Sequence, residues 1–287
     1  MPFTEKQHLE IYPALSLSRA DLWLSGKSVL ITGGGYGIGA GLAHSFAQAK
    51  ASRIAICGRT ESRVKETASE LQSAYPETKI EYYIASITDE KAVQSMFDSF
   101  GCPDILVNNA GAFFRGVNLK DIDLKDWWAT IETNLLGTAI VTQTFLRAKS
   151  EGQPGTVIMM NSSGAHWGKL PGMTHYVAGK AGVFRFSELL QSENPEVRVF
   201  NVSPGFVETD MMKLAEEAGL KGFPMTSKDL VGNFAVWLCS SEADFLKGRF
   251  VRVGWDIEEL KEKKEEIVEK DFLTCSLSGM DGQAMRL

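Results

Sequence analysis

A short β-branched run followed directly by a glycine cluster constrains the fold of this 287-residue chain more than any other feature. Ser28 to Thr32 predicts a strand, Gly33 to Gly39 predicts a tight turn, and a pattern through Leu42, Phe46 and Ala49 predicts a helix. Glycine lets the backbone approach a ligand closely, and the free N–H groups and dipole at the start of a helix attract anions. An ordinary loop is the alternative, but the position between a strand and a helix favours a site for a dinucleotide pyrophosphate.

The rest of the chain continues this alternation of short apolar runs with helical patterns. Such alternation predicts one doubly wound, seven-stranded parallel sheet with helices on both faces, a Rossmann-type α/β fold. A hydrophobic content of 44% supplies enough apolar surface for a large core. The strands are expected at residues 28–32, 53–57, 79–85, 105–108, 156–162, 198–203 and 249–253.

We expect three parts along the chain: an N-terminal arm at residues 1–25, a Rossmann-fold domain at 26–254 and a C-terminal helical extension at 255–287. The arm is apolar enough to lie against the core. The extension begins with a charged helix from 257 to about 270, which is either a solvated appendage or an element that closes the pocket or contacts a second subunit. Its narrow apolar stripe consists of Leu260, Ile267 and Val268.

Charge and cysteine content exclude several classes of protein. A net charge of −6 argues against nonspecific binding to nucleic acids or anionic membranes, because both need a basic surface. The sequence has no pattern of a signal peptide and no apolar run of about 18 residues, which favours a cytoplasmic protein. Four cysteines are far apart and lack metal-ligand spacing, so reduced thiols and no metal site are expected at Cys57, Cys102, Cys239 and Cys275.

Tyr176 and Lys180 are one helical turn apart, and Ser163 lies thirteen residues before the tyrosine. Positions i and i+4 share one face of a helix, so the phenol oxygen and the amine can reach a common point. A nearby ammonium favours the phenolate and lowers the phenol pKa from its usual value of about 10. Ser163 would lie at a strand's carboxyl end, where open α/β sheets bind ligands. A chance pair on a helix surface is the alternative for the tyrosine and lysine taken alone.

The order and spacing of these motifs resemble those of a classical short-chain dehydrogenase/reductase. The resemblance extends from about residue 26 to residue 253, nearly the whole chain. Besides Ser163 and Y-x-x-x-K, it rests on T-G-x-x-x-G-x-G at Thr32–Gly39, N-N-A-G at Asn108–Gly111, Asn134 in a predicted helix and P-G-x-V-x-T at Pro204–Thr209.

This resemblance implies an oxidoreductase in which a hydride moves between a nicotinamide and a carbonyl or secondary alcohol. Tyr176 would act as the general acid, and Ser163 would hydrogen-bond the carbonyl oxygen, where negative charge develops. Lys180 would lower the tyrosine pKa and bind the nicotinamide ribose. Asn134 would help to hold a water that relays protons toward Lys180, although an ordinary polar helix residue is the alternative.

The end of the second predicted strand favours NADP over NAD. Enzymes that select NAD usually have an acid there, whereas Gly58 leaves room and Arg59 offers a planar cation suited to phosphate oxygens. A solvated surface charge is the alternative for Arg59. The sequence departs from relatives at Tyr36, where a basic residue is frequent, and at Ser86, where an aspartate usually contacts the adenine. Besides Tyr176 and Lys180, the residues expected to bind the cofactor are Gly33, Gly35, Tyr36, Gly37, Ile38, Gly39, Arg59, Thr60, Ser86, Asn109, Ala110, Gly111, Pro204, Gly205, Val207 and Thr209.

The segments expected around the nicotinamide are mostly apolar, which predicts a bulky hydrophobic ketone rather than a sugar or a charged acid. This composition resembles that of reductases that tailor secondary metabolites, although each residue could instead belong to the core. His166 and His175 are expected to be structural. The pocket residues are expected to be Phe113, Phe114, Ala165, His166, Trp167, Met173, Phe206, Met211 and Met212.

Two other uses of the same scaffold stay open: cyclase or isomerase chemistry, and a noncatalytic NADP-binding regulator, which would be expected to lose Tyr176 or Lys180. A homodimer or homotetramer is expected, because predicted helices at 127–149 and 172–193 are too apolar to leave a face in water, and relatives pair these helices across a twofold axis. The apolar faces consist of Ile131, Leu135, Ile140, Val141 and Phe145 on the first helix and Val183, Phe184, Phe186 and Leu189 on the second.

Overall fold

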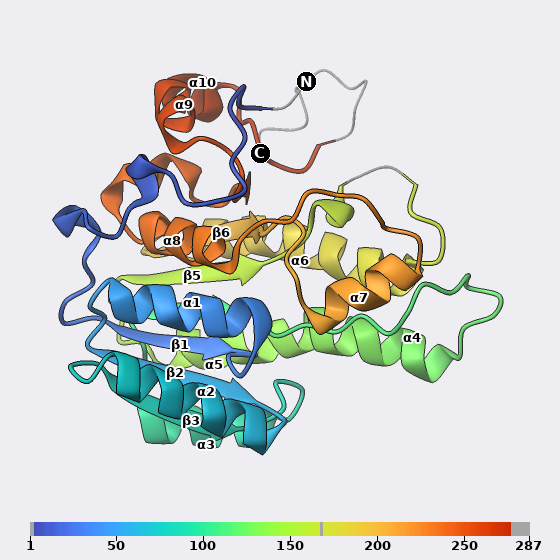
Figure 1. The fold of residues 1–287 in the computed structure, drawn as a ribbon, viewed down its shortest axis with the longest axis horizontal. Helices are drawn as coiled ribbons and strands as arrows, with labels where there is room; N and C mark the ends of the chain where they lie inside the picture. The colour runs from blue at the N-terminus through green and yellow to red at the C-terminus, as the bar shows by residue number, and fades with distance from the viewer. Residues whose placement is uncertain (1–2, 167–168, 277–287) are drawn as a thin grey trace.

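Seven parallel strands form the centre of the computed structural model, which describes residues 3–166 and 169–276. Their order is β3-β2-β1-β4-β5-β6-β7, so the chain winds outward from β1 in both directions (Figure 1). This order confirms the doubly wound Rossmann-type α/β fold. The strands are β1 (Ser28–Thr32), β2 (Arg53–Gly58), β3 (Lys79–Ile84), β4 (Ile105–Asn108), β5 (Gly155–Met160), β6 (Val197–Ser203) and β7 (Phe250–Arg252).

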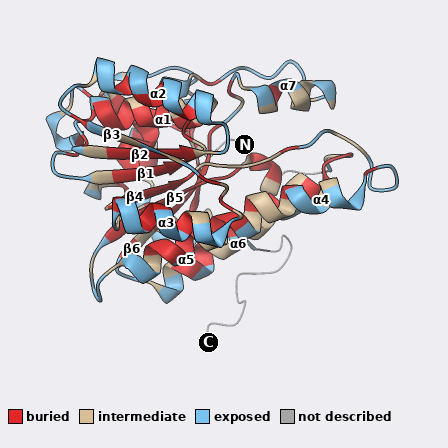
Figure 2. Ribbon diagram, turned by 90° about the horizontal axis from the view of Figure 1, so that it is seen from below, coloured by how far each residue is buried: buried red, intermediate tan, exposed pale blue. Residues whose placement is uncertain are grey.

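Helices cover both faces of the sheet. In β1, Val29 and Ile31 pack into one hydrophobic cluster and Leu30 into a second cluster on the opposite face. Burial of both faces explains why the strands are nearly continuous apolar runs, and Figure 2 shows buried strands between helices whose outer residues are exposed. The first cluster includes α1 (Gly37–Gln48), α2 (Glu61–Ala74) and α8 (Lys228–Leu238), and the second includes α3 (Glu90–Phe100), α5 (Thr138–Ala148) and α6 (Thr174–Glu193).

The single helix expected at residues 127–149 is divided into three parts. A π-helical turn, Glu132–Gly137, separates α4 (Leu124–Ile131) from α5. Within this wider turn Asn134 is buried, and its side chain accepts a hydrogen bond from Ala112 N–H (2.9 Å) and donates one to Ala112 O (2.7 Å). The π-helical turn therefore lies where a buried amide connects the helix to the loop after β4.

The chain leaves β5 earlier than the sequence suggested. The strand ends at Met160, two residues before the expected end, and Ser162 begins a 3₁₀ turn, Ser163–Ala165, by accepting a hydrogen bond from Gly164 N–H (3.1 Å). Serine side chains often compete with regular structure by bonding to nearby backbone groups. The two neighbouring serines therefore lie in a turn rather than in an extended strand.

The N-terminal arm and the C-terminal extension pack against each other beside α8 (Figure 1). His8 Nε2 lies 2.8 Å from Asp256 Oδ2, and the Phe3 and Trp255 rings are 5.3 Å apart between centroids. The helix expected from residue 257 is divided at Lys263 into α9 (Ile257–Glu262) and α10 (Lys264–Glu269). Because the break redirects the side chains that follow it, the predicted apolar stripe is wrong at its end: Leu260 and Ile267 are fully buried, but Val268 is 52% exposed.

One helix, α7 (Asp210–Glu217), stands apart from both layers beyond the carboxyl ends of the strands (Figure 1). The cap residue Thr209 begins it by accepting a hydrogen bond from Met212 N–H (3.1 Å). Across the described part of the chain, none of the helices combines the length and the apolar character needed to cross a membrane.

Candidate active site

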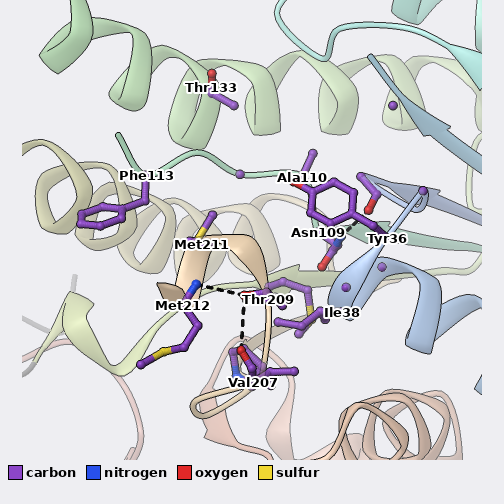
Figure 3. Close-up of a pocket in the computed structure, with 18 of the residues that line it drawn as sticks. Tyr36, Ile38, Asn109, Ala110, Phe113, Thr133, Val207, Thr209, Met211 and Met212 are labelled. Carbon is purple, nitrogen blue, oxygen red and sulfur yellow. Dashed lines mark hydrogen bonds between the residues drawn. The ribbon is translucent and has the colours of Figure 1, made fainter. Parts of the chain in front are cut away.

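A cavity of about 310 Å³ lies at the carboxyl edge of the sheet, where open α/β folds bind ligands. Its lining extends from Arg59, after β2, past the glycine turn, to Tyr176 on α6. In Figure 3, Tyr36 and Phe113 lie toward opposite ends of the lining, with Thr209 between them. The residues at the Tyr36 end suit a nucleotide, and those at the Phe113 end suit an apolar compound.

The glycine turn is held in place by the loop after β4. Gly33 has a φ of +66°, and a Cβ on Gly39 would lie 2.1 Å from Gly33 O, so both positions require glycine. Asn109 Nδ2 donates hydrogen bonds to Thr32 O (2.9 Å) and Gly33 O (3.1 Å). Thr32 Oγ1 in turn accepts from the N–H groups of Asn109 and Ala110, each at 3.0 Å. The side chain of Asn109 therefore fixes the turn.

The residues that the sequence assigned to the cofactor come together in this cavity. They derive from the glycine turn, the ends of β2 and β3, the loop after β4, α6 and the segment between β6 and α7. The lining includes Gly33, Gly35, Tyr36, Gly37, Ile38, Gly39, Arg59, Thr60, Ser86, Asn109, Ala110, Gly111, Tyr176, Lys180, Pro204, Gly205, Val207 and Thr209.

Tyr176 is placed by α6 near the start of the helix. Burial raises the pKa of its phenol above the usual value, and a hydrogen bond with Ser162 acts in the opposite direction without cancelling the effect of burial. The Phe113 ring meets the Tyr176 ring edge-on, with 5.5 Å between centroids. Tyr176 therefore keeps its proton at neutral pH, as a proton donor must.

Lys180 is buried one helical turn further along α6. Burial lowers the pKa of its amine to about 8, and Nζ donates a hydrogen bond to Met160 O (2.8 Å). Nζ lies 5.9 Å from the centroid of the Tyr176 ring. The sequence led us to expect that Lys180 would lower the tyrosine pKa. Burial of the phenol dominates and raises the net pKa of Tyr176, and the lowering expected from Lys180 stays a prediction.

Two neighbouring serines after β5 have different surroundings in the structure. Ser163, the expected catalytic serine, is buried, and its Oγ lies 2.9 Å from Ser203 Oγ. Ser162 lines the cavity and hydrogen-bonds Tyr176. Because the 3₁₀ turn directs Ser163 toward β6, the serine nearest the tyrosine is Ser162. In the sequence, the only sign that either serine could face the tyrosine was that Ser162 and Ser163 are consecutive.

Asn134 lies behind the cavity wall, and its expected role in holding a relay water stays a prediction. Both polar atoms of its amide bond to the backbone of Ala112, and in the described part of the chain its neighbour Thr133 lines the cavity instead. A Cβ on Gly111 would lie 2.9 Å from Asn134 Oδ1 and 3.6 Å from Lys180 Nζ. Asn134 therefore lies close behind the cavity wall, and its side chain holds the loop after β4.

The apolar end of the cavity matches part of the expected pocket. Phe114, Ala165 and His166 do not belong to its described lining, and Trp167 lies outside the described residues. His166 instead meets the Phe250 ring edge-on, with 4.7 Å between centroids. The expected residues that do line the cavity are Phe113, Met173, Phe206, Met211 and Met212, and Ala215 and Leu220 add to them.

His175 has a packing role beside the site. It is fully buried, its ring stacks on Phe113 with 5.6 Å between centroids, and neither ring nitrogen has a hydrogen-bond partner among the described residues. Burial lowers the pKa of His175, so the imidazole is neutral at physiological pH. This histidine is therefore held by apolar contact rather than by hydrogen bonds.

The fold and the cavity together define a nucleotide-binding α/β protein with a tyrosine, a lysine and a serine at the carboxyl edge of its sheet. The family model for short chain dehydrogenases matches residues 27–219. The chain is also 33% identical to short chain dehydrogenase mpl6 of Monascus purpureus, over 95% of each chain. The chain belongs to the short-chain dehydrogenase/reductase family of oxidoreductases, which bind a nicotinamide cofactor.

Solved structures resemble this one closely. A short chain dehydrogenase from Burkholderia cenocepacia in complex with NADP matches with a TM-score of 0.71 and 26% identity, over 82% of this chain and 99% of that chain. A 3-oxoacyl-(acyl-carrier protein) reductase from Brucella melitensis with bound NAD matches with a TM-score of 0.74 and 26% identity, over 87% and 98%. Both cofactors thus occur among similar folds, and the choice between them depends on the residues of this chain.

Proposed function

We propose that this chain is an NADP(H)-dependent oxidoreductase that transfers a hydride between the nicotinamide and a carbonyl or secondary alcohol of a bulky, largely apolar small molecule. The observation that carries the proposal is one continuous cavity. Its lining joins the glycine turn, the Tyr176 and Ser162 hydroxyls and an apolar wall formed by residues such as Met212. A hydride donor and an apolar carbonyl compound could therefore meet beside a proton donor.

The glycine turn fits the phosphates of a dinucleotide. Gly37, Ile38 and Gly39 open α1 and line the cavity, and no side-chain hydrogen bond caps this end of the helix at Tyr36. The first N–H groups of a helix have no partner within the helix, and a phosphate can accept hydrogen bonds from them. These residues would hold the cofactor pyrophosphate.

The roles of the other residues follow from the charge that develops during reduction. When bound, the reduced nicotinamide supplies a hydride to the carbonyl carbon. Tyr176 gives its phenolic proton to the carbonyl oxygen, and the Ser162 hydroxyl donates a hydrogen bond to the same oxygen as it becomes negative. Lys180, when protonated, binds ribose hydroxyls and favours the phenolate that remains on Tyr176.

Arg59 and its surroundings support NADP as the cofactor. Gly58 and Arg59 line the cavity where β2 ends, and no Asp or Glu belongs to the lining in the described part of the chain. A guanidinium without a competing carboxylate suits phosphate oxygens. The NADP complex of the Burkholderia relative shows that a similar fold binds this cofactor.

The apolar wall supports a hydrophobic ketone as the substrate. Aromatic, methionine and leucine side chains line this end of the cavity. Walls of this kind bind apolar ligands and contain few polar groups that orient them. We propose a role in tailoring secondary metabolites, on the basis of this wall and of the similarity to the Monascus dehydrogenase. The cytoplasmic location expected from the sequence stays a prediction.

A homo-oligomer is part of the proposal, but its basis differs from the one expected. Val141, Phe145 and Val183 fill the core of their own protomer rather than an interface. Of the expected faces, Leu189 is exposed, and the other exposed apolar side chains in this region are Leu124, Trp128 and Leu136. Large apolar side chains gathered on helices that face water favour association with a second copy.

Turnover assays with both cofactors test the proposed function. Purified protein is incubated with NADPH or NADH and a panel of bulky apolar ketones, with a sugar and a charged keto acid as controls. We expect oxidation of NADPH and formation of the alcohol with the bulky ketones. Tight NADPH binding without turnover of any ketone would favour the noncatalytic regulator, and a product at the oxidation level of its substrate would favour cyclase or isomerase chemistry.

A further inference from the structure

Arg63 connects the two sides of the cavity at its nucleotide end. It lies in the first turn of α2, and its guanidinium carbon is 4.7 Å from the centroid of the Tyr36 ring in the glycine turn. Arg63 Nη1 also donates a hydrogen bond to Asp210 Oδ2, at the start of α7 (3.0 Å). One side chain thus contacts the cofactor-binding turn and the helix that carries part of the apolar wall.

Arg63 can exchange its ion-pair partner Asp210 for another anion with little loss of free energy. The side chains of Arg63 and Asp210 are 47% and 56% exposed, and Asp210 also lies 3.7 Å from Lys213 Nζ. Exposed ion pairs of this kind change an equilibrium by less than about fivefold. The Tyr36 ring would keep the guanidinium at the nucleotide end of the cavity if Asp210 released it, because aromatic faces attract arginine.

Arg63 and Arg59 lie at the same end of the cavity. Both line it, Thr60 lies between them in the sequence, and the described lining contains no carboxylate. A phosphate monoester carries nearly two negative charges at neutral pH, which two guanidinium groups can match better than one. Relatives frequently have a basic residue in the glycine turn where this chain has Tyr36. Here the guanidinium of Arg63, from α2, lies over the ring of that tyrosine and supplies the positive charge.

We propose that Arg63 is a second determinant of NADP preference, and that Asp210 competes with the adenosine phosphate of the cofactor for its guanidinium. The inference rests on the proposed use of NADP. Without the phosphate, Arg63 pairs with Asp210 and connects α2 to α7. With the phosphate present, Arg63 turns to it and the connection to α7 opens.

Equilibrium binding of NADPH and NADH to the full chain, followed by protein fluorescence at fixed salt, tests this exchange. Arg63→Ala should weaken NADPH binding about tenfold and change NADH binding less than about twofold, because only NADPH has the phosphate. Asp210→Asn should strengthen NADPH binding by about two- to fivefold through loss of the competitor. In the Arg63→Ala background, Asp210→Asn should have no effect on NADPH.

Lys65→Ala is the matched control, because it also removes an exposed cation from α2 and does not belong to the described cavity lining. It should leave the ratio of the two affinities unchanged. Equal losses of NADPH and NADH in Arg63→Ala, or an NADPH loss in Lys65→Ala as large as that in Arg63→Ala, would overturn the role of Arg63. No gain in Asp210→Asn would overturn the competition. A wild-type preference for NADH would instead show that the proposed cofactor is wrong.

Discussion

The hydroxyl of Ser162 is hydrogen-bonded to Tyr176, whereas that of Ser163, the next residue in the chain, lies 2.9 Å from Ser203 Oγ. Two serines with the same chemistry therefore have different surroundings, one in the lining of the cavity and one beside the end of β6. The difference arises because the 3₁₀ turn after β5 sends consecutive side chains in different directions. It also makes the assignment of the catalytic serine testable with a pair of matched variants.

Ser162→Ala should lower kcat/KM for ketone reduction by roughly 10² to 10³, the usual loss when a hydrogen-bond donor to a developing oxyanion is removed. Ser163→Ala should change kcat/KM by less than about threefold, because its hydroxyl bonds to Ser203 rather than to the tyrosine. Steady-state kinetics of both variants with one ketone make the comparison. The reverse order of losses would restore Ser163 as the catalytic serine.

Tyr176→Phe keeps the ring and its edge-on contact with Phe113 but removes the proton that reduction requires. Reduction should slow by roughly 10² to 10⁴, the usual contribution of general acid catalysis. NADPH binding, measured separately by fluorescence, should change little. Activity within about threefold of the wild type would remove Tyr176 from the mechanism.

Lys180 should make cofactor binding depend on pH in the alkaline range. Burial lowers the pKa of its amine to about 8, so the ammonium is present below that pH and lost above it. We therefore expect the Kd of NADPH to be lowest at neutral pH and to rise as pH increases through about 8. Lys180→Arg, which stays charged, should bind with little change over the same range. Wild-type affinity that is constant through this range would contradict the prediction.

Arg59→Ala should weaken NADPH binding by about ten- to a hundredfold, because a charge-assisted contact to phosphate contributes about 1.5 to 3 kcal/mol. NADH binding should be nearly unchanged, since NADH lacks this phosphate. Gly58→Asp should act in the same direction through repulsion. The KM values for both cofactors with one ketone at fixed salt give the result. Equal losses for both cofactors would show that Arg59 is structural.

Light scattering at micromolar concentration should show a dimer or tetramer. Leu136→Asp or Leu189→Asp should shift the protein toward the monomer, because each places a charge among the exposed apolar side chains of the long helices. Val268→Asp alters a side chain of similar exposure on α10 and serves as the control. A monomeric wild-type protein would show that these side chains do not form an interface.

Much of the fold could be predicted because local sequence and tertiary structure agree. The β-branched run of β1, the glycines after it and the pattern of α1 each favour the conformation that the structure has, so the strand, turn and helix could be predicted. The strand ends deviate by no more than two residues from those expected, with β5 the largest difference. The cofactor-binding residues came together because parallel strands place their carboxyl ends at one edge.

The remaining differences depend on geometry that residue spacing does not specify. Counting back from Tyr176 identified Ser163, but the direction of each serine depends on how the turn leaves β5. The π-helical turn at Asn134 depends on a bond to Ala112, which is far away in the sequence. The sequence of an apolar helix face likewise does not show whether the face packs against the core of its own protomer or is exposed. Phe145 is buried in the core, whereas Leu189 is exposed.

Through the N-terminal arm, this chain could vary its substrate range without substituting any residue that lines the cavity. Leu9 O accepts a hydrogen bond from Ser227 N–H (2.8 Å), and the adjacent Thr226 N–H donates to Phe206 O (2.6 Å) on the apolar wall. Substitutions in the arm can therefore reposition the wall from outside while Tyr176 and the glycine turn stay fixed. Selection could act separately on substrate range and on hydride transfer, because the arm bonds to the segment beside Phe206, whereas the proton donor Tyr176 lies on α6.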